Sequence, residues 1–182
     1  GVCSGLGDSG SLTNWLDRSI NDIAGLPADG VLTLGDLSGH GIKLQVMTTA
    51  LSHGRPYRLP FQRGERFFFR PAEMSQLFPP PVIRHMVATA PEVNGRVPTG
   101  PGDLLPFPSA DQLPVIVALR MSLSFPILIS AVPLWAIDRT APGNDLGTAA
   151  TAERCWFSDG GICLNFPIHL FDGPIPSRPT FC

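Results

Sequence analysis

The amino-acid sequence predicts a single α/β domain, built from short helices and strands that alternate along the chain. Its 182 residues suit one domain of ordinary size that buries its own hydrophobic core. The 19 glycines and 20 prolines divide the chain into short elements and exclude long helical bundles and coiled coils. Segments with apolar residues every three or four positions alternate with segments in which every second residue is apolar. This alternation predicts helices packed in layers on a sheet.

The first elements are predicted from a change in the spacing of apolar residues. Ser11 or Thr13 can cap a helix that ends at Gly25-Leu26-Pro27, and its apolar positions are Leu12, Trp15, Leu16, Ile20 and Ile23. Alternation over residues 42–48 predicts a strand. The turn at Gly54-Arg55-Pro56 then leads into a second strand over residues 57–61, which predicts a hairpin.

Three consecutive phenylalanines, at positions 67–69, predict a short strand that is buried on both faces. These side chains could instead form an acyl-binding wall or a patch that touches a membrane. A helical turn is expected from Pro71 through Leu77, followed by a short helix over residues 82–90.

The second half of the chain begins with a stretch rich in proline and glycine, over residues 92–110. It is predicted to be an exposed loop, either a lid over a site or a simple insertion. A largely buried helix is predicted from Pro114 through Met121, because Arg120 is its only charged residue. The remaining expected elements are strands over residues 132–137 and 154–157, a turn over 144–147 and a short helix over 165–171.

The composition excludes several classes of partner and cofactor. With 13 basic and 15 acidic residues the formal net charge is −2, so no nucleic-acid partner is expected. Charged residues make up 15% and apolar residues 43% of the chain, which is typical of an ordered globular protein. The four cysteines form no C-x-x-C pair, and no two histidines are four apart on one helix. We therefore expect neither a metal site nor a cofactor.

No membrane-spanning segment or leader peptide is predicted in this chain. The most apolar stretch, residues 123–137, is interrupted by Pro126 and Pro133 and is shorter than the ~20 residues that span a bilayer, so it is expected to be core. Position 1 is glycine and no basic-then-apolar leader follows, so we expect the chain to begin inside a longer protein. The scattered cysteines are compatible with a reducing compartment. The sequence leaves the compartment open, and with neither a leader nor a span in it the cytoplasm is slightly favoured.

A carboxylate followed by two glycines, Asp159-Gly160-Gly161, comes directly after the last predicted strand. A sharp turn at the end of a buried strand exposes the carboxylate at the edge of the sheet, and glycines permit such a turn. An aspartate in this position can act as a base. The same three residues are also typical of a tight turn without any catalytic role.

The wider segment around Asp159, WFSDGGICLNFP over residues 156–167, resembles the catalytic-aspartate motif of bacterial patatin-like phospholipases. Three further stretches resemble members of that family in the same order, and together they extend the resemblance over nearly the whole chain: residues 32–37, 46–51 and 118–126. The resemblance implies a three-layer α/β/α domain that hydrolyses carboxylic esters of lipids. It also implies a lipid or ester substrate and no cofactor.

In that family the nucleophile is a serine in a G-x-S-x-G turn, the base is the aspartate of D-G-G, and a glycine-rich loop binds the oxyanion. The resemblance makes Asp159 the base, held in place by Gly160 and Gly161. The sequence contains neither G-x-S-x-G nor the glycine-rich loop. Residues 1–182 are therefore expected to be the C-terminal part of one catalytic domain, incomplete on its N-terminal side, and inactive alone.

The alternative function is that of a pseudoenzyme, or of a structural fragment that packs against a missing partner segment. Missing strands would leave an open sheet edge or an exposed apolar face, so the isolated chain is expected to self-associate. A lipid substrate would also bring the chain into peripheral contact with a membrane.

Four other groups of residues are weaker candidates. Residues 1–5 satisfy G-x-C-x-G with Cys3, but a nucleophile elbow needs a strand before it. Residues 7–10 contain the G-D-S-G of serine proteases and the D-S-G of aspartic proteases, without the earlier partners or the strand those sites need. Arg120 either faces an anionic head group or pairs with a carboxylate. Ser122 and Ser124 either line the site or cap backbone groups.

Overall fold

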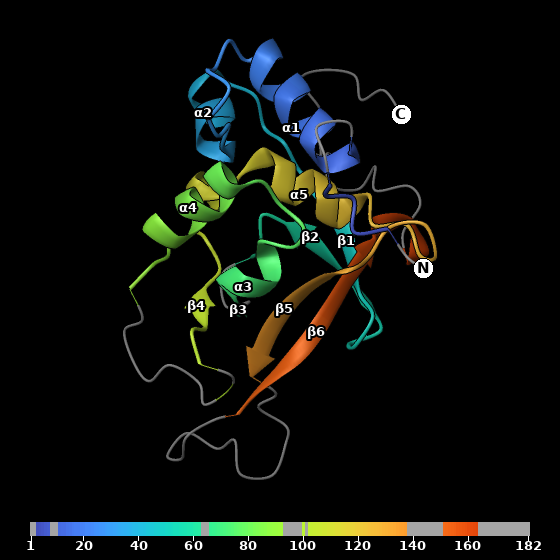
Figure 1. Cartoon of the computed structure of the whole chain (residues 1–182). Coiled ribbons are helices and arrows are strands. Elements are labelled where there is room, and N and C mark those ends of the chain that lie inside the picture. The colour runs from blue at the N-terminus through green and yellow to red at the C-terminus, as the bar shows by residue number, and fades with distance from the viewer. Residues whose placement is uncertain are drawn as a thin grey trace, which may run out of the picture.

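The computed structural model describes residues 3–7, 11–62, 66–92, 100, 102–137 and 151–163, which form a mixed α/β structure around one six-stranded sheet (Figure 1). The strands lie in the order β2-β1-β6-β5-β3-β4, and every neighbouring pair is antiparallel. Their bounds are β1 Val46–Ala50, β2 Arg55–Leu59, β3 Phe67–Phe69, β4 Leu105–Pro106, β5 Val132–Ile137 and β6 Ala152–Asp159. The helices are α1 Leu12–Ile23, α2 Leu34–Gly39, α3 Pro71–Met74, α4 Pro80–Ala88 and α5 Val115–Ser122.

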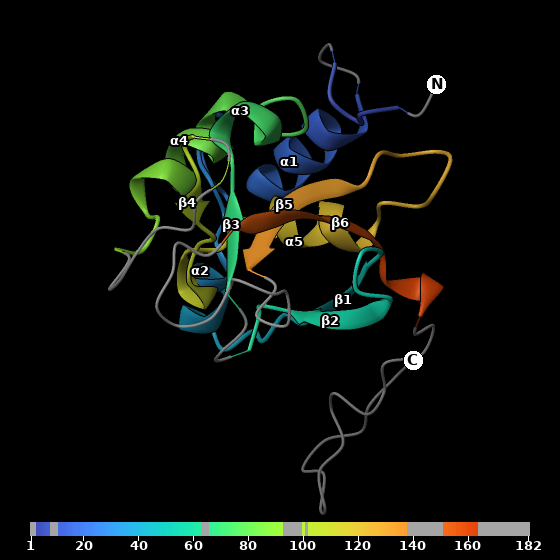
Figure 2. The same cartoon turned by 90° about the horizontal axis from the view of Figure 1, so that it is seen from below.

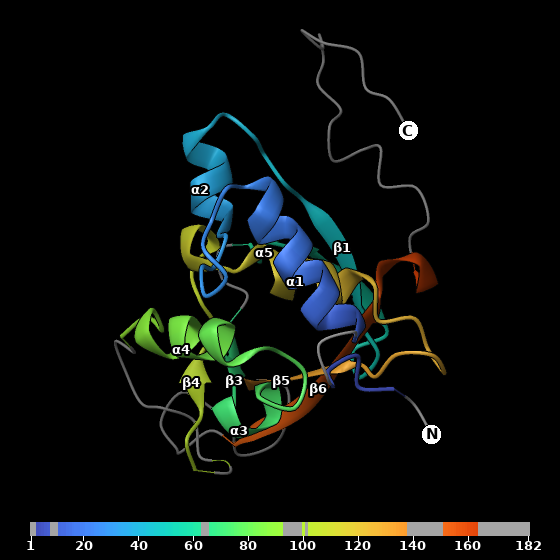
Figure 3. The same cartoon turned by 45° about the horizontal axis from the view of Figure 1, so that its top comes forward.

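Helix α5 is the centre of the packing. It contacts β1 and β6 on one side and α1 on the other, and most of its side chains are buried. Figure 2 shows the sheet curving around α5, and Figure 3 shows α1 lying across it. Within the described part of the chain, no helix combines the length and the apolar character needed to cross a membrane.

Several elements are confirmed with nearly the predicted bounds. Helices α1 and α5 and strand β5 are present, and Phe67–Phe69 forms a strand whose three side chains are all buried. The hairpin of β1 and β2 is also present, but β2 begins at Arg55, so two of the predicted turn residues belong to the strand. Helix α4 begins at Pro80, earlier than predicted, because prolines are tolerated in a first helical turn that needs no N–H donors. The predicted turn over 144–147 and the helix over 165–171 lie outside the described residues.

The segment before β1 differs from the prediction. The strand begins at Val46 and not at Ile42, because helix α2 precedes it and Gly41 then takes a positive φ of 74°. This short helix is fixed by a capping box, in which the Asp36 N–H donates to Thr33 Oγ1 and the Thr33 N–H donates to Asp36 Oδ2. The hydrogen bonds that the Thr33 hydroxyl and then the Thr33 N–H donate to the Asp36 carboxyl lower its pKa.

The prediction of an exposed loop over residues 92–110 is wrong for its second part. Leu104, Phe107 and Pro108 are buried, and strand β4 pairs with β3. The Phe107 N–H donates to the Phe67 carbonyl at 2.9 Å, so this part of the segment extends the sheet. The abundance of proline hid it, although proline is tolerated on an edge strand such as β4.

The core next to the sheet is rich in aromatic rings. The Phe157 ring of β6 lies 5.1 Å from Phe67, 5.7 Å from Tyr57 and 5.7 Å from Phe61, all in tilted or edge-to-face orientations. Such geometry aligns the positive ring edge with the negative ring face and adds to the burial of apolar area. The cluster joins β6 to β2 and β3, which lie far from it in the sequence.

The amphipathic helix α1 is confirmed, and the side that it presents to the protein is mixed. Leu16 and Ile20 pack against the hydrophobic core, beside three buried polar residues: Thr13, Asp17 and Asn21. Burial raises the pKa of the Asp17 carboxyl. Trp15 and Ile23, the rest of the apolar side, are 59% and 89% exposed.

We predict that Phe157→Ala lowers the free energy of unfolding by about 3 to 5 kcal/mol, because the substitution leaves a cavity within the aromatic cluster. The matched control is Phe125→Ala, since Phe125 is 54% exposed and should lose less than ~1 kcal/mol. Urea denaturation of the two variants measures both values. Equal losses would show that the rings around Phe157 do not form a stabilising core.

Candidate functional site

Asp159 is the last residue of β6 and the N-cap of a short 3-10 helix, η2 (Gly160–Ile162). It lies opposite Thr48 of β1, and its N–H donates to the Ser124 carbonyl at 3.0 Å. The side chain is half-buried and makes no capping hydrogen bond. The carboxylate accepts no hydrogen bond from the described residues. Among those residues both of its oxygens therefore remain available as acceptors.

The glycine after Asp159 is required by a close approach of two strands. A Cβ on the buried Gly160 would lie 2.4 Å from the Met47 carbonyl oxygen of β1, which no side chain can accommodate. The φ of Gly160 is not positive, so the expected reason, a turn that only glycine adopts easily, is wrong at this position. Gly161 follows it in η2 and is half-buried.

A line of buried hydroxyl groups fixes the backbone on either side of Asp159. Ser158 Oγ donates to the Ser124 carbonyl at 2.6 Å, which is the same oxygen that accepts the Asp159 N–H. Thr48 Oγ1 lies 2.8 Å from the Ser158 carbonyl and 3.1 Å from the Met121 carbonyl. The end of β6 is thereby tied both to β1 and to the C-terminus of α5.

Arg120 of α5 is completely buried and fixes the segments next to this region by hydrogen bonds. Its Nη1 donates to Ser124 Oγ at 2.5 Å, and its Nη2 donates to the carbonyls of Ser4 at 2.8 Å and Ser130 at 3.0 Å. Burial lowers the pKa of Arg120 to about 10. No carboxylate pairs with it in the described ranges, so of the two roles expected for Arg120 the ion pair is absent there.

The residues around Arg120 leave little space for a larger side chain. Gly5 has a positive φ of 76°, and a Cβ there would lie 3.0 Å from Thr13 Oγ1 and 3.1 Å from Arg120 Nε. Neither of these two buried polar atoms has a hydrogen-bond partner in the structure. Ser124 Oγ also donates to the Arg120 carbonyl at 2.6 Å, so Ser124 caps backbone groups, which is one of its two expected roles.

The N-terminal candidates are not brought to Asp159. Cys3 is exposed, forms a bridge with Ile129, and accepts a hydrogen bond from the Gly5 N–H at 3.3 Å. The N-terminal segment and η2 overlap in Figure 1, but Figure 2 shows them well apart. Gly1, Val2 and residues 8–10 of the other motifs lie outside the described residues.

A cysteine–histidine pair that the sequence did not reveal lies under the β1–β2 hairpin. Cys155 Sγ is 3.3 Å from His53 Nε2, His53 Nδ1 is 2.8 Å from the Tyr57 hydroxyl, and Arg55 donates to that hydroxyl. A nucleophilic cysteine would need a lowered pKa. Burial instead raises the pKa of Cys155 to about 11, which disfavours the thiolate form that a nucleophile needs.

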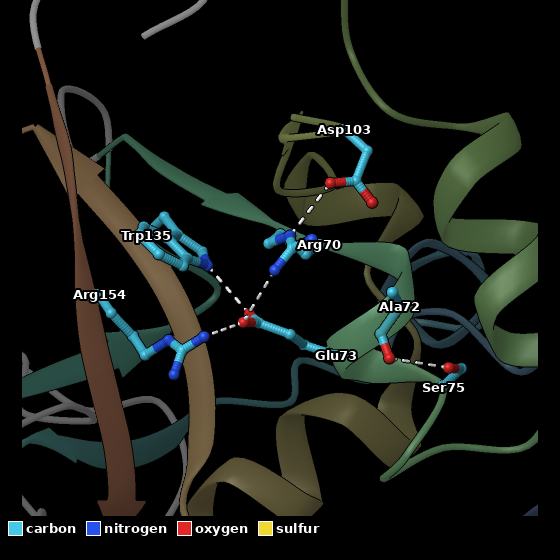
Figure 4. A network of polar contacts seen from close by, with 7 residues as sticks. All are labelled: Arg70, Ala72, Glu73, Ser75, Asp103, Trp135 and Arg154. Atoms are coloured by element: carbon cyan, nitrogen blue, oxygen red, sulfur yellow. Dashed lines mark hydrogen bonds and ion pairs between the residues drawn. The ribbon is translucent and has the colours of Figure 1, made fainter. Parts of the chain in front are cut away.

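A second polar network joins α3 to the sheet (Figure 4). Glu73 accepts a hydrogen bond from Trp135 Nε1 at 3.0 Å and pairs with Arg154 and Arg70, and Arg70 also pairs with Asp103. Arg70, Glu73 and Arg154 border a cavity of about 490 Å³ that Ser4, Ser130 and Trp156 also line. The charges of two cations and two carboxylates cancel in this network, which joins α3 to β5 and β6.

The described residues contain no group of three His, Cys, Asp or Glu side chains that could hold a metal ion. The hydroxyl groups that fix the backbone at Asp159 come from β1, β6 and the segment directly after α5.

The comparisons with known proteins leave the family open. No family model matches the chain, and no solved structure matches it significantly. It is similar to a protein named RpoH suppressor from Rhizobium meliloti (strain 1021), with 37% identity over 215 residues. The match covers 93% of this chain and 33% of the relative, so the chain spans about a third of that protein's length.

We predict that iodoacetamide at pH 8 modifies Cys3 and Cys163, which are exposed, and leaves Cys155 unmodified until the protein is unfolded. Peptide mass mapping before and after addition of guanidinium measures this.

The pH dependence of stability gives a second prediction for Cys155. The ordinary pKa of 9.0 rises to about 11 on folding, so the unfolded thiol ionises first and stability should fall as the pH rises from 9 to 11. Cys155→Ala removes that part of the fall. Rapid modification of native Cys155 would contradict the inferred protonation state.

Proposed function

We propose that this chain supplies the catalytic aspartate of a lipid acyl hydrolase of the patatin-like type, with Asp159 as the base of a Ser–Asp dyad. The observation that carries the proposal is the state of Asp159 itself. Its backbone is held by Ser124 and by the approach of Gly160 to β1, while its carboxylate makes no hydrogen bond among the described residues. A carboxylate fixed in this way and left unpaired suits a base better than it suits a turn.

The arrangement of helices on the sheet also supports a three-layer α/β/α domain. Thr48 and Phe157 lie on the same face of the sheet, and Thr48 contacts α5. Trp135 and Arg154 point to the opposite face, because side chains alternate along a strand, and both contact Glu73 of α3. Helices therefore pack on both faces, as this type of domain requires.

In the proposed reaction the Asp159 carboxylate accepts the proton of a serine hydroxyl as the serine oxygen attacks the ester carbonyl carbon. The tetrahedral intermediate then collapses, the carbon–oxygen bond to the alcohol breaks, and Asp159 returns the proton to the leaving alcohol. Water, deprotonated by Asp159, hydrolyses the acyl-serine in the second half of the cycle. The sequence of this chain contains no G-x-S-x-G, so the serine and the oxyanion donors come from a segment outside it.

The substrate class is a carboxylic ester of a lipid, taken up without a metal or cofactor. No nucleic-acid partner is proposed, and contact with lipid is peripheral. Residues 1–182 act as one unit of a single domain in this proposal.

The alternative is a non-catalytic module that packs against a partner segment, and helix α1 favours it. Trp15 and Ile23 on its apolar side are exposed, as expected when a neighbouring segment is missing. The sheet edges are poor sites for association, since β2 contains Pro56 and β4 contains Pro106. A G-x-S-x-G after an apolar strand in the longer protein would support the enzyme, and its absence would support the module.

We predict that Asp159→Asn in the complete catalytic domain lowers kcat by about 100-fold or more while leaving folding nearly unchanged. Asparagine keeps the size of the side chain but cannot accept the serine proton. The measurement is hydrolysis of p-nitrophenyl esters, together with thermal unfolding of the same samples.

The control variant is Asp103→Asn, because Asp103 is an exposed carboxylate paired with Arg70 and far from the proposed chemistry in sequence. Residues 1–182 alone should hydrolyse the esters no faster than a boiled sample. A folded Asp159→Asn protein with activity within a few-fold of the unsubstituted domain would remove Asp159 from the mechanism. Turnover by the isolated chain that Cys3→Ala abolishes would instead assign the nucleophile to Cys3.

A further inference from the structure

We infer that residues 125–128, the loop between α5 and β5, dock on the surface of a lipid layer and hold the Asp159 region against it. The choice of lipid as the partner rests on the proposed function. The loop itself is recognised from its exposure, its backbone strain, its anchoring and its position.

The loop presents apolar side chains to solvent. Ile127 is 84% exposed, Leu128 is 64% exposed and Phe125 is 54% exposed. No charged residue occurs between Arg120 and Asp138 in the sequence. In Figure 2 the loop, drawn in gold between α5 and β5, projects from the body of the molecule. An uncharged apolar group of this kind on a surface marks a contact with a protein or a membrane.

The backbone of the loop is strained at Ile127, the most exposed of these residues. Ile127 has a positive φ of 74°, a conformation that a β-branched residue rarely adopts. Glycine or asparagine would occupy the position with less strain. The sequence places a large apolar residue there although folding gains nothing from it, and strain of this kind is typical of binding and catalytic sites.

Buried Arg120 anchors both ends of the loop. Its Nη1 donates to Ser124 Oγ before the loop, and its Nη2 donates to the Ser130 carbonyl after it. Within the loop the Ile129 N–H donates to the Phe125 carbonyl at 3.0 Å. These bonds prevent the loop from folding back onto the protein, so it offers a preformed contact.

The position of the loop links it to the candidate base. Ser124, the residue directly before the loop, accepts the hydrogen bonds of the Asp159 N–H and the Ser158 hydroxyl. A lipid layer that contacts residues 125–128 would therefore lie next to the end of β6. An ester group at the surface of that layer would meet Asp159 without leaving the layer.

The chemistry of the loop favours a neutral lipid surface. It carries no cation that could attract anionic head groups, and the whole chain has a formal net charge of −2. The other exposed apolar surface, on α1, differs because charged Arg18 and Asp22 are exposed beside Trp15. Binding through the loop should depend on apolar contact and hardly on salt.

The test is flotation of the 182-residue chain with phosphatidylcholine vesicles in a sucrose gradient, in which protein aggregates do not float. We expect the chain to float. The bound fraction should be the same with and without added phosphatidylglycerol, and the same with and without about 0.5 M salt, which screens surface charges. Ile127→Gly and Phe125→Ser should each lower the bound-to-free ratio by about tenfold. The control Ile23→Ser, at the exposed face of α1, should leave it unchanged.

Thermal unfolding of the same variants separates loss of binding from loss of folding. Ile127→Gly relieves the strained φ, so its melting temperature should stay the same or rise while its vesicle binding falls. The inference is overturned if the chain does not float, if Ile127→Gly floats like the unsubstituted chain, or if Ile23→Ser loses binding equally. Flotation needs no turnover, so a failure of Asp159→Asn to reduce activity would refute the hydrolase and not the lipid contact.

Discussion

The buried guanidinium of Arg120 is the interaction on which the arrangement of the other parts depends. It lies at the C-terminal end of α5, completely shielded from water, and no carboxylate neutralises it among the described residues. Burying an unpaired cation is unfavourable unless its N–H groups are satisfied. Three segments provide acceptors for it: the N-terminal segment through Ser4, the end of α5 through Ser124, and the start of β5 through Ser130. Nε of Arg120 is already without a partner in the part of the chain that the structure describes, and displacing any of these segments would leave further buried donors unpaired.

One consequence is that the candidate base and the apolar loop share a single support. Ser124 is held by Arg120 and in turn holds the Asp159 N–H, while Ser124 and Ser130 together fix the loop that carries Ile127. Asp159 is further confined by Gly160, which can have no side chain next to the Met47 carbonyl. The carboxylate that we propose as the base is thus held on a rigid backbone.

Local patterns predicted the elements that depend on local rules. The apolar spacing of α1, α5 and β5 gave their bounds, but periodicity shows which residues share a face and not what that face contacts, so the exposure of Trp15 and Ile23 on α1 was missed. Helix α2 was missed because two of its six residues are glycines and only its capping box stabilises it. The Cys155–His53 pair and the support of Asp159 by Arg120 depend on strand register and on contacts between distant segments. The position of Asp159 at the end of a strand was predicted, and the partners that fix it were not.

Hydrogen–deuterium exchange of the Asp159 amide in Arg120→Lys tests most directly whether Arg120 supports the site. Lysine keeps the charge, but its single ammonium group cannot reach three separated acceptors. The account predicts at least about tenfold faster exchange at the amides of Asp159 and Ser130, equivalent to about 1.4 kcal/mol, with no change at Tyr57 in the β1–β2 hairpin. The exposed control Arg84→Lys should change none of them. Unchanged protection of the Asp159 amide in a folded Arg120→Lys protein would contradict the account.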